Sequence, residues 1–417
     1  MNRNKTLTYF LCAFLLLTIG IAKDFKYKVG TSFFNFDKEY WWLKNNNKGL
    51  IVSKKNFYID FELKGQLVDF NSSLFYQDNS KIVLNETFIK YWFKENSFLK
   101  IGKYYRDFSV YLNDNLSSGS MLISKNAQPM PKIGFKKFKK INSEFNLNYG
   151  MSHGFFDKSG RGFSDFYQKS PFLHEKYIYL TVEKQSYFYG IGLVHEAIWG
   201  GASNEYGKFP SGVKDFLKIF ISADGKDTDG AHFNALGSHL GIWDFYLIKN
   251  LKSKDEERQI KFYYQHFFED TSSLRFANKI DGLWGVELSN IIPHSSLVLE
   301  YLDTSNCCID PPYQDDNYYS NYQYEAGWTF MNYTLGNPFI TNTAAYRDLF
   351  KLVHFGFQKK IKKGEVVVKV SRKTSIKDIF KYYSSFSKNI SENLYLNLFV
   401  VGDGLNSSTG IGFNYNF

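Results

Sequence analysis

The amino-acid sequence predicts an all-β fold, a transmembrane antiparallel β-barrel of the bacterial outer membrane. Three observations support this expectation. The 417-residue chain ends in a stretch, 411–417, in which bulky side chains alternate with Gly and Asn. Aromatic residues make up 19% of the chain although its mean hydropathy is only −0.35, which suits a two-faced sheet with aromatic girdles. Beyond the N-terminal apolar stretch no run of ~18 apolar residues occurs, so a spanning chain must close into a barrel.

The first 22 residues have the features of a secretory signal peptide. Arg3 and Lys5 precede an almost wholly apolar run over residues 7–21. Gly20 and Ala22 provide small residues at the −3 and −1 positions of a cleavage site. We expect cleavage after Ala22 rather than a membrane anchor, because the apolar run is short for a span of about 20 residues.

Strand patterns fill the rest of the chain. Residues 57–68 alternate strictly, with Phe61 on the apolar face and Glu62 on the polar face. The charged face cannot be a dry core, so it suits a water-filled lumen or a solvated sheet face. Similar segments recur between turn-like stretches, and we expect strands near residues 86–94, 98–104, 144–151, 176–183, 187–195, 216–222, 240–249, 258–268, 283–289, 296–302, 350–358, 364–371, 394–401 and 409–417.

The predicted domain organisation is simple. No linker rich in Pro, Ser or Gly divides the chain, so we expect residues 23–417 to form one barrel domain. Residues 23–55 are expected to be an irregular N-terminal lead-in. Allowing about 20–25 residues for each strand and its share of turns gives roughly 16 to 18 strands. No segment predicts a long amphipathic helix.

The C-terminal stretch is similar to the assembly signal of bacterial outer-membrane proteins. The chain ends in Phe417, with Tyr415 and Phe413 at alternate positions before it. This likeness implies that the barrel assembly machinery is a partner. A soluble β-sandwich could also end in an amphipathic strand, so the stretch does not decide the fold alone.

Charge and composition limit the partners. The formal net charge of +10 favours anionic partners, which for a surface protein are lipopolysaccharide or an acidic polysaccharide, and we expect no nucleic acid. The alternative is that the basic residues are scattered over solvated loops. The chain has no C-x-x-C motif and no clustered His pattern, so we expect no metal and no cofactor.

Several stretches are denser in Gly, Trp, His and Asp than a strand requires: 192–201, 237–244, 263–270, 281–285, 300–304, 318–328 and 336–338. In these motifs, and from about Tyr40 to the C-terminus, the chain resembles the capsule assembly Wzi family of outer-membrane proteins. The resemblance implies an 18-stranded barrel, integral to the outer membrane, that acts as a non-enzymatic surface lectin. It also implies a capsular or other surface polysaccharide as partner. The chain departs from the best-known members, which carry an N-terminal helical plug: only about 20 to 35 residues separate Ala22 from the first clear strand, so the segment resembles a shorter variant and we expect no helical plug.

Sugar recognition needs flat rings to stack on pyranose faces and polar groups to read the hydroxyls. The dense motifs supply both kinds. The candidates for polysaccharide binding are His195, Trp199, Trp243, Asp244, Tyr264, Gln265, His266 and Trp284. The structural alternative is that the tryptophans belong to girdles at the lipid interface. His195 and Glu196 are consecutive, so only one of them can face the lumen of a continuous strand.

Two other functions compete with the lectin. A general or sugar-specific outer-membrane porin is the main rival, because the polar face of residues 57–68 suits a channel as well. An outer-membrane hydrolase is the third. Ser152-His153 and Ser238-His239 are adjacent pairs, but neighbours on a strand point to opposite faces, so neither pair is a ready nucleophile and base. The chain has no G-x-S-x-G motif, and we expect no enzyme.

Overall fold

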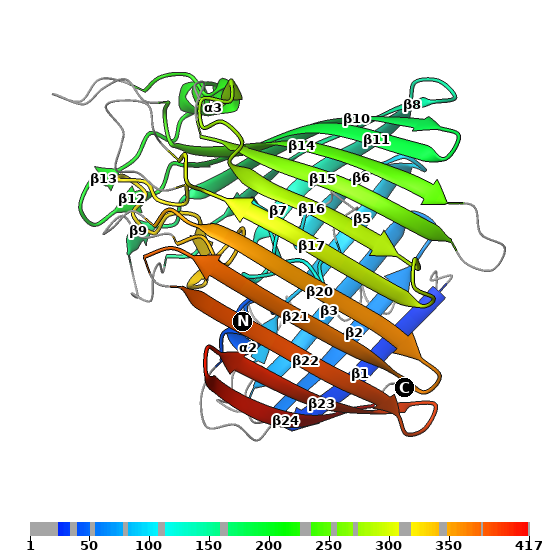
Figure 1. Cartoon of the computed structure of the whole chain (residues 1–417). Coiled ribbons are helices and arrows are strands. Elements are labelled where there is room, and N and C mark those ends of the chain that lie inside the picture. The colour runs from blue at the N-terminus through cyan, green and yellow to red at the C-terminus, as the bar shows by residue number, and fades with distance from the viewer. Residues whose placement is uncertain are drawn as a thin grey trace, which may run out of the picture.

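The computed structural model describes residues 24–33, 40–50, 55–77, 82–106, 113–158, 166–225, 235–251, 257–269, 274–307, 318–341, 348–376 and 378–415. Within them, 18 long antiparallel strands follow one another around a nearly closed barrel (Figure 1). The strands are β1 (Asp24–Phe33), β2 (Lys55–Lys64), β3 (Val68–Gln77), β5 (Thr87–Lys94), β6 (Ser97–Lys103), β7 (Pro131–Lys140), β8 (Phe145–Phe155), β10 (Phe172–Lys184), β11 (Tyr187–Trp199), β14 (Ser238–Leu251), β15 (Arg258–Phe268), β16 (Gly282–Ser289), β17 (Ser295–Asp303), β20 (Lys351–Ile361), β21 (Gly364–Thr374), β22 (Ile379–Asn389), β23 (Leu394–Asp403) and β24 (Asn406–Tyr415).

Each barrel strand pairs with its neighbours in sequence, and β1 contacts β24, where the barrel closes. The short strand β4 (Ile82–Leu84) adds to the same sheet beside β3. Two small sheets are separate from the barrel sheet. One consists of β9 (Tyr167–Lys169), β12 (Ala202–Ser203) and β13 (Gly207–Lys208), and the other of β18 (Thr329–Phe330) and β19 (Tyr333–Thr334).

The N-terminal segment corrects the predicted irregular lead-in. Asp24–Phe33 form β1, which pairs with the whole of β2, from Asp24 opposite Lys64 to Phe33 opposite Lys55. Phe25 and Tyr27 alternate with Lys26 and Lys28, so the segment carries the same period of two as the strands that were predicted. The predicted signal peptide, residues 1–22, lies outside the described residues.

Three further elements differ from the sequence prediction. The stretch predicted as one strand, 57–68, is split into β2 and β3 by a turn at 65–67. The predicted strand at 216–222 is instead the helix α3 (Val213–Ile221), because its apolar residues Phe216, Ile219 and Phe220 recur at the helical spacing. A single helical turn, α2 (Trp41–Lys44), precedes β2. None of the described helices is long and apolar enough to cross a membrane.

The two ends of the barrel differ in their connections. At one end, which we call the short-turn end, consecutive strands are joined by turns such as 65–67, 185–186 and 362–363. At the other, the long-loop end, the connections include 104–130, 200–237 and 304–350. Figure 1 shows α3 and the small strands β9, β12 and β13 gathered at the long-loop end, on the left of the view.

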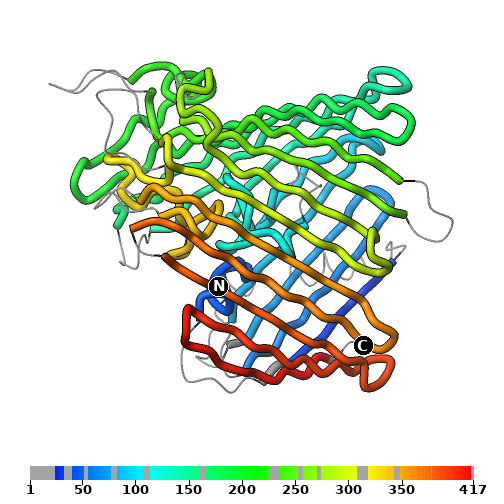
Figure 2. Tube along the Cα trace, in the orientation of Figure 1, coloured from blue at the N-terminus to red at the C-terminus, as the bar shows by residue number. Residues whose placement is uncertain are grey.

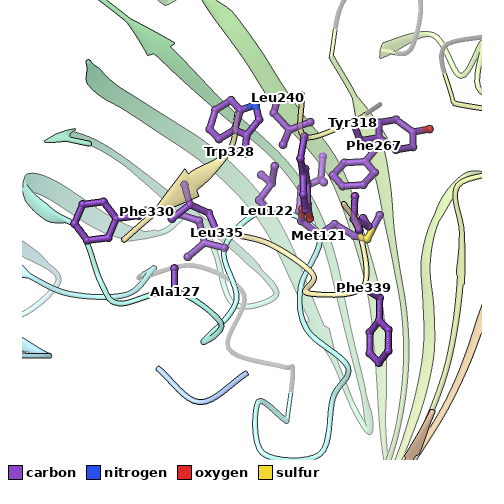
Figure 3. Close-up of a cluster of buried hydrophobic side chains, with 14 of the residues drawn as sticks. Met121, Leu122, Ala127, Leu240, Phe267, Tyr318, Trp328, Phe330, Leu335 and Phe339 are labelled. Carbon is purple, nitrogen blue, oxygen red and sulfur yellow. The ribbon is translucent and has the colours of Figure 1, made fainter. Parts of the chain in front are cut away.

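The half of the lumen nearest the long-loop end is filled by the protein itself. Residues 113–130 and 318–341, which we call the plug segments, fold back inside the ring of strands (Figure 2, cyan and yellow-orange). Their buried side chains pack on lumen-facing residues of the wall, as Figure 3 shows for Met121, Leu122 and Trp328 beside Leu240 and Phe267. The lumen-facing residues buried in this half include Val194, Ile198, Ile242, Leu283, Leu302 and Leu352.

The other half of the lumen is polar. Lys261 pairs with Glu287 at 3.3 Å, and the amide of Gln358 donates to Glu365 at 2.6 Å, both toward the short-turn end. Charged and amide groups of this kind are typical of a water-filled cavity. The lumen therefore has a packed part under the long loops and a polar part under the short turns.

Cross-strand pairs of an aromatic ring and a glycine recur around the wall. Tyr246 in β14 lies directly opposite Gly190 in β11, and a Cβ on Gly190 would lie 2.0 Å from the Tyr246 ring. Tyr58 in β2 covers Gly30 in β1, and Tyr263 in β15 covers Gly285 in β16, in the same way. The glycines let the rings lie flat on the neighbouring strand, which accounts for part of the Gly content of the dense motifs.

Candidate functional site

Gln265 was predicted to contact polysaccharide, and the structure places it on the lumen face of β15, fully buried. Its side-chain oxygen accepts hydrogen bonds from the backbone N–H of Met121 at 3.0 Å and the hydroxyl of Ser120 at 3.2 Å. Both donors belong to the first plug segment. Gln265 therefore fastens the plug to the wall and has no exposed atom for a ligand at the surface.

The buried carboxylate of Glu300 in β17 holds the same plug segment. It accepts hydrogen bonds from the hydroxyl of Ser117 and the N–H of Ser118, each at 2.6 Å, and from the hydroxyl of Tyr263 at 2.7 Å. Asp244, another predicted contact residue, is equally buried and accepts a 2.6 Å hydrogen bond from Tyr179 across the wall. These two carboxylates are satisfied inside the protein.

The plug segments are joined to one another as well as to the wall. The hydroxyl of Ser124 donates to the carbonyl of Gly336 at 2.7 Å, and the amide of Asn337 donates to the carbonyl of Gly119 at 2.7 Å. The hydroxyl of Tyr319 donates to Met121 O at 2.6 Å. Because these bonds link residues about two hundred positions apart, the two segments form one packed body.

A third buried polar group lies on the lumen face near the first plug segment. Lys132 in β7 pairs with Glu175 in β10 at 3.3 Å, and the hydroxyl of Ser152 donates to Glu175 at 2.7 Å. Glu196 in β11 lies directly opposite Glu175 on the neighbouring strand and is also fully buried. His195, its neighbour in sequence, points outward, so the sequence argument that only one of them can face the lumen is confirmed.

Tyr264, His266, Trp243 and Trp284 lie together on the outer surface of the wall. The rings of Tyr264 and Trp284 are stacked with centroids 3.7 Å apart, and the hydroxyl of Tyr264 lies 2.8 Å from Nδ1 of His266. The indole N–H groups of Trp243 and Trp284 donate to backbone carbonyls of the 269–281 loop at 3.2 Å. Outward rings at one level of a barrel are typical of an aromatic girdle, which was the structural alternative for these residues.

His195 and Trp199, the remaining predicted residues, lie under α3 on the outer surface. Four histidines on neighbouring strands form a row there: His153, His174, His195 and His239. His239 donates from Nε2 to the carbonyl of Leu236 at 2.8 Å, so the Nδ1 of a neutral His239 accepts from His195 Nε2, also at 2.8 Å. His174, His195 and His239 of this row are buried by the protein.

Among the described residues, no group of three or more His, Cys, Asp or Glu side chains is arranged to hold a metal ion. The histidine row does not meet that condition, because its members are spread in a line across four strands. The covered imidazoles instead provide the surface on which α3 packs.

The surface at the long-loop end carries two exposed tyrosine rings with carboxylates beside them. Tyr206 and Tyr322 are 46% and 51% exposed, and the carboxylates of Glu205 and Glu325 lie close by. Desolvation, together with those two carboxylates, raises the pKa of Tyr206. We call these four residues the tyrosine patch.

The sequence analysis did not select the tyrosine patch. Tyr322 belongs to one of the dense motifs, 318–328, but its exposure differs from that of Tyr318, Tyr319 and Tyr324, which are buried. Tyr206 follows the polar pair Asn204-Glu205 in a long loop, which is the only signal in the sequence that could have indicated it.

The comparisons with known proteins decide the family. The family model described as capsule assembly protein Wzi matches residues 42–347, which is more than half of the chain. The chain belongs to the capsule assembly protein Wzi family. A search of curated proteins by sequence found no match.

Several solved structures are similar to this Wzi-family chain. Wzi of Escherichia coli, described as an outer membrane protein involved in group 1 capsule assembly and as a carbohydrate-binding β-barrel, matches with a TM-score of 0.63 and 15% identity over 97% of this chain and 86% of that one. OpdO of Pseudomonas aeruginosa matches with a TM-score of 0.48 and 9% identity over 95% of this chain and 97% of that one. The prediction of an all-β outer-membrane barrel with 18 strands favoured is confirmed.

Proposed function

We propose that this Wzi-family protein binds a capsular or other extracellular polysaccharide at the cell surface and catalyses no reaction. The short-turn end, where β1 begins and β24 ends, would face the periplasm, and the long loops would face outward, as in other bacterial outer-membrane barrels. A cleaved signal peptide over residues 1–22 would export the chain.

The observation that carries this proposal is the filled lumen. A diffusion porin needs a water-filled path through the barrel. Here the plug segments occupy the half of the lumen under the long loops and are fixed to the wall by Glu300, Gln265 and His354. Because packed protein fills this half of the lumen, the outer end of the barrel is a rigid surface rather than an open mouth, which favours binding over transport.

The tyrosine patch is the surface that we propose for the polysaccharide. Exposed rings of Tyr206 and Tyr322 can stack on the apolar faces of sugar units, while the carboxylates of Glu205 and Glu325 accept hydrogen bonds from hydroxyls. Acidic units would be repelled by these carboxylates, so we place them against exposed lysines of the same end, such as Lys158, Lys169 and Lys208. Many weak contacts along one polymer then add to a useful avidity.

The predicted partners in assembly belong to the same proposal. Phe413 in β24 is exposed on the outward face of the barrel, where outer-membrane lipid would contact it. Tyr415 ends β24 opposite Leu394, and Phe417 lies outside the described residues. We propose that this C-terminal strand is recognised by the barrel assembly machinery and that lipopolysaccharide surrounds the finished barrel.

The experiment compares three measurements on the detergent-purified protein. We expect retention of the cell's own purified polysaccharide on immobilised barrel, no stable large conductance steps in a planar bilayer, and no product from phospholipid or peptide substrates. A variant in which a Gly-Ser linker replaces residues 114–126 should open a conductance, which shows that the assay detects a channel. Large steps from the unmodified protein without polysaccharide retention would establish the porin instead, and turnover of either substrate would establish the hydrolase.

A further inference from the structure

The helix α3 packs on the outside of the barrel at the long-loop end, beside the wall strands rather than above the lumen (Figure 1). Its ring Phe216 contacts His153, His174 and Trp199, with centroids 5.2, 5.4 and 5.5 Å apart. The side chain of Ile219 is fully buried beneath it. One face of α3 is therefore a fixed part of the barrel wall.

The attachment of α3 is polar at its C-terminal end. The ammonium of Lys176 in β10 donates to the carbonyl of Phe220 and lies 4.1 Å above the Phe220 ring. A cation at the C-terminus of a helix is favourable because the terminal carbonyls are otherwise unpaired. Just beyond the helix, the hydroxyl of Ser222 lies 3.0 Å from Nε2 of His195. These contacts fix which face of α3 points away from the barrel.

The face that points away is apolar and exposed. Val213, Leu217 and Ile221 follow one another at four-residue intervals and are 80%, 59% and 71% exposed. This spacing places them in one stripe. On β10, the exposed apolar residues Ile178 and Leu180 follow Lys176, whose ammonium lies over the Phe220 ring of α3. An exposed apolar stripe on a helix that packs against the outside of a barrel wall lies where hydrocarbon can meet the protein.

Cations border this stripe. Lys214 is exposed and Lys218 donates to the carbonyl of Asp224 at 3.0 Å, both on α3 itself. Lys176 lies at the C-terminal end of the helix, over the Phe220 ring. Asp215, whose carboxylate accepts from the N–H of Gly212 at 2.8 Å, is the one acidic residue of α3. Several ammonium groups around an apolar stripe match a lipid that carries more than one phosphate.

We propose that α3 is an interfacial helix whose stripe of Val213, Leu217 and Ile221 inserts among the acyl chains of the outer leaflet, and whose lysines bind the phosphates of a glycolipid there. The helix holds the long loops at a fixed height above the membrane. This role is independent of polysaccharide binding, because the tyrosine patch belongs to other residues of the same end.

The first test measures depth with a nitroxide label at Leu217→Cys in reconstituted vesicles. The control is Ile376→Cys, another exposed apolar position, 92% exposed against 59% for Leu217, in the turn between β21 and β22. The unsubstituted protein, treated in parallel, gives the background. At each position the label gives a ratio of its collision rate with oxygen to its collision rate with a water-soluble nickel chelate. We expect this ratio to be several-fold higher at 217 than at 376. An excess of nickel collisions at 217 would place the stripe in water, and low collision rates with both reagents would mean that protein covers it; either result overturns the proposal.

The second test concerns the phosphates. The variant Lys214→Glu/Lys218→Glu and the control Lys362→Glu/Lys363→Glu, a charge reversal in a short turn at the other end, are floated with vesicles of phosphatidylcholine alone, with phosphatidylglycerol, or with lipid A. We expect lipid A to increase the co-floating wild-type protein several-fold, and the α3 variant alone to lose that increase. Equal gains with phosphatidylglycerol would overturn the glycolipid assignment, and an unchanged α3 variant would overturn the role of the lysines. A difference in gel mobility between unheated and heated samples confirms that both variants are folded.

Discussion

The hydroxyl of Ser117 donates a 2.6 Å hydrogen bond to the carboxylate of Glu300, joining residues that are 183 positions apart in the chain. Ser117 belongs to the first plug segment and Glu300 to the barrel wall. The same carboxylate holds Ser118 and Tyr263, and all four groups are buried. The plug is thus fixed to the wall by a small number of satisfied polar groups.

Replacing this carboxylate should loosen the plug. In Glu300→Ala three buried donors lose their acceptor, so we expect the free energy of unfolding to fall by about 3 kcal/mol. Urea unfolding in detergent micelles measures the loss, and hydrogen exchange over 113–126 should rise. Asp378→Ala is the control, because it removes an exposed ion pair with Arg372 and should change neither quantity. Equal effects of the two substitutions would contradict the role of Glu300.

Adding one methyl group to a glycine of the wall should be costly. In Gly190→Ala the new Cβ would lie 2.0 Å from the ring of Tyr246, and we expect a loss of about 1–3 kcal/mol. The loss would be read from the temperature at which the folded band disappears on a gel. In a Tyr246→Leu background the same substitution should cost clearly less, since the clash is with the ring. If the two costs are equal, the glycine is required for another reason.

Asp281, in the loop before β16, should make stability depend on pH. Burial raises its pKa to about 6, although hydrogen bonds from Asn306 and Tyr318 oppose the shift. The native pKa then lies above the value of about 3.9 in the unfolded chain, so the stabilisation is complete below pH ~4 and is lost as the pH rises through about 6.

The stability of the wild type relative to Asp281→Asn should therefore fall by up to about 3 kcal/mol between pH ~4 and ~7. Unfolding by urea at several pH values measures this difference. A parallel comparison with Asp378→Asn should give a flat line, because Asp378 is exposed. A wild-type advantage that instead grows with pH would show that the carboxylate is stabilised in its charged form.

The tyrosine patch gives a prediction for binding. Tyr206→Ala and Tyr322→Ala should each weaken polysaccharide retention several-fold, and together about tenfold or more, because a stacked ring contributes on the order of 1 kcal/mol. Surface plasmon resonance on immobilised barrel measures the affinity. Met331→Ala, an exposed apolar residue of the same end, is the matched control. If all three variants bind like the wild type, the polysaccharide uses another surface.

Most of the wall could be predicted from the sequence, because period-two alternation is a local property. The regions that were missed carry weak or different patterns. β22 is rich in Ser, β7 is rich in Lys, and β1 was placed in the lead-in although Phe25 and Tyr27 alternate with lysines. The segment 213–221 contains a short apolar run, which periodicity alone cannot assign to helix or strand.

The interior could not be predicted, because its burial is set by the closure of the wall around it. Residues 113–130 are rich in Ser and Asn and resemble a solvated loop. One signal was present. Apart from His195 and Glu196, residues 192–199 carry apolar side chains or Gly on both faces, whereas residues 57–64 alternate, and this difference separates the packed half of the lumen from the polar half.

The predicted site residues were grouped by sequence proximity, and the structure separates them by face. Tyr264 and His266 point outward while Gln265 between them points inward, as the alternation of a strand requires. The stacking of Tyr264 on Trp284 follows from their direct pairing between β15 and β16. The tyrosine patch joins two long loops, a relationship that only the folded chain creates.

The bonds between the plug segments also connect parts of the chain that are made at different times. Asn126 reaches Thr334 at 2.9 Å, although the first lies before β7 and the second after β17. The seam at which the cylinder shuts is formed by β1 and β24, the first and last strands to be made. The hydrogen bonds of the lumen contents therefore connect segments made early and late, and the closed seam of β1 and β24 encloses both plug segments.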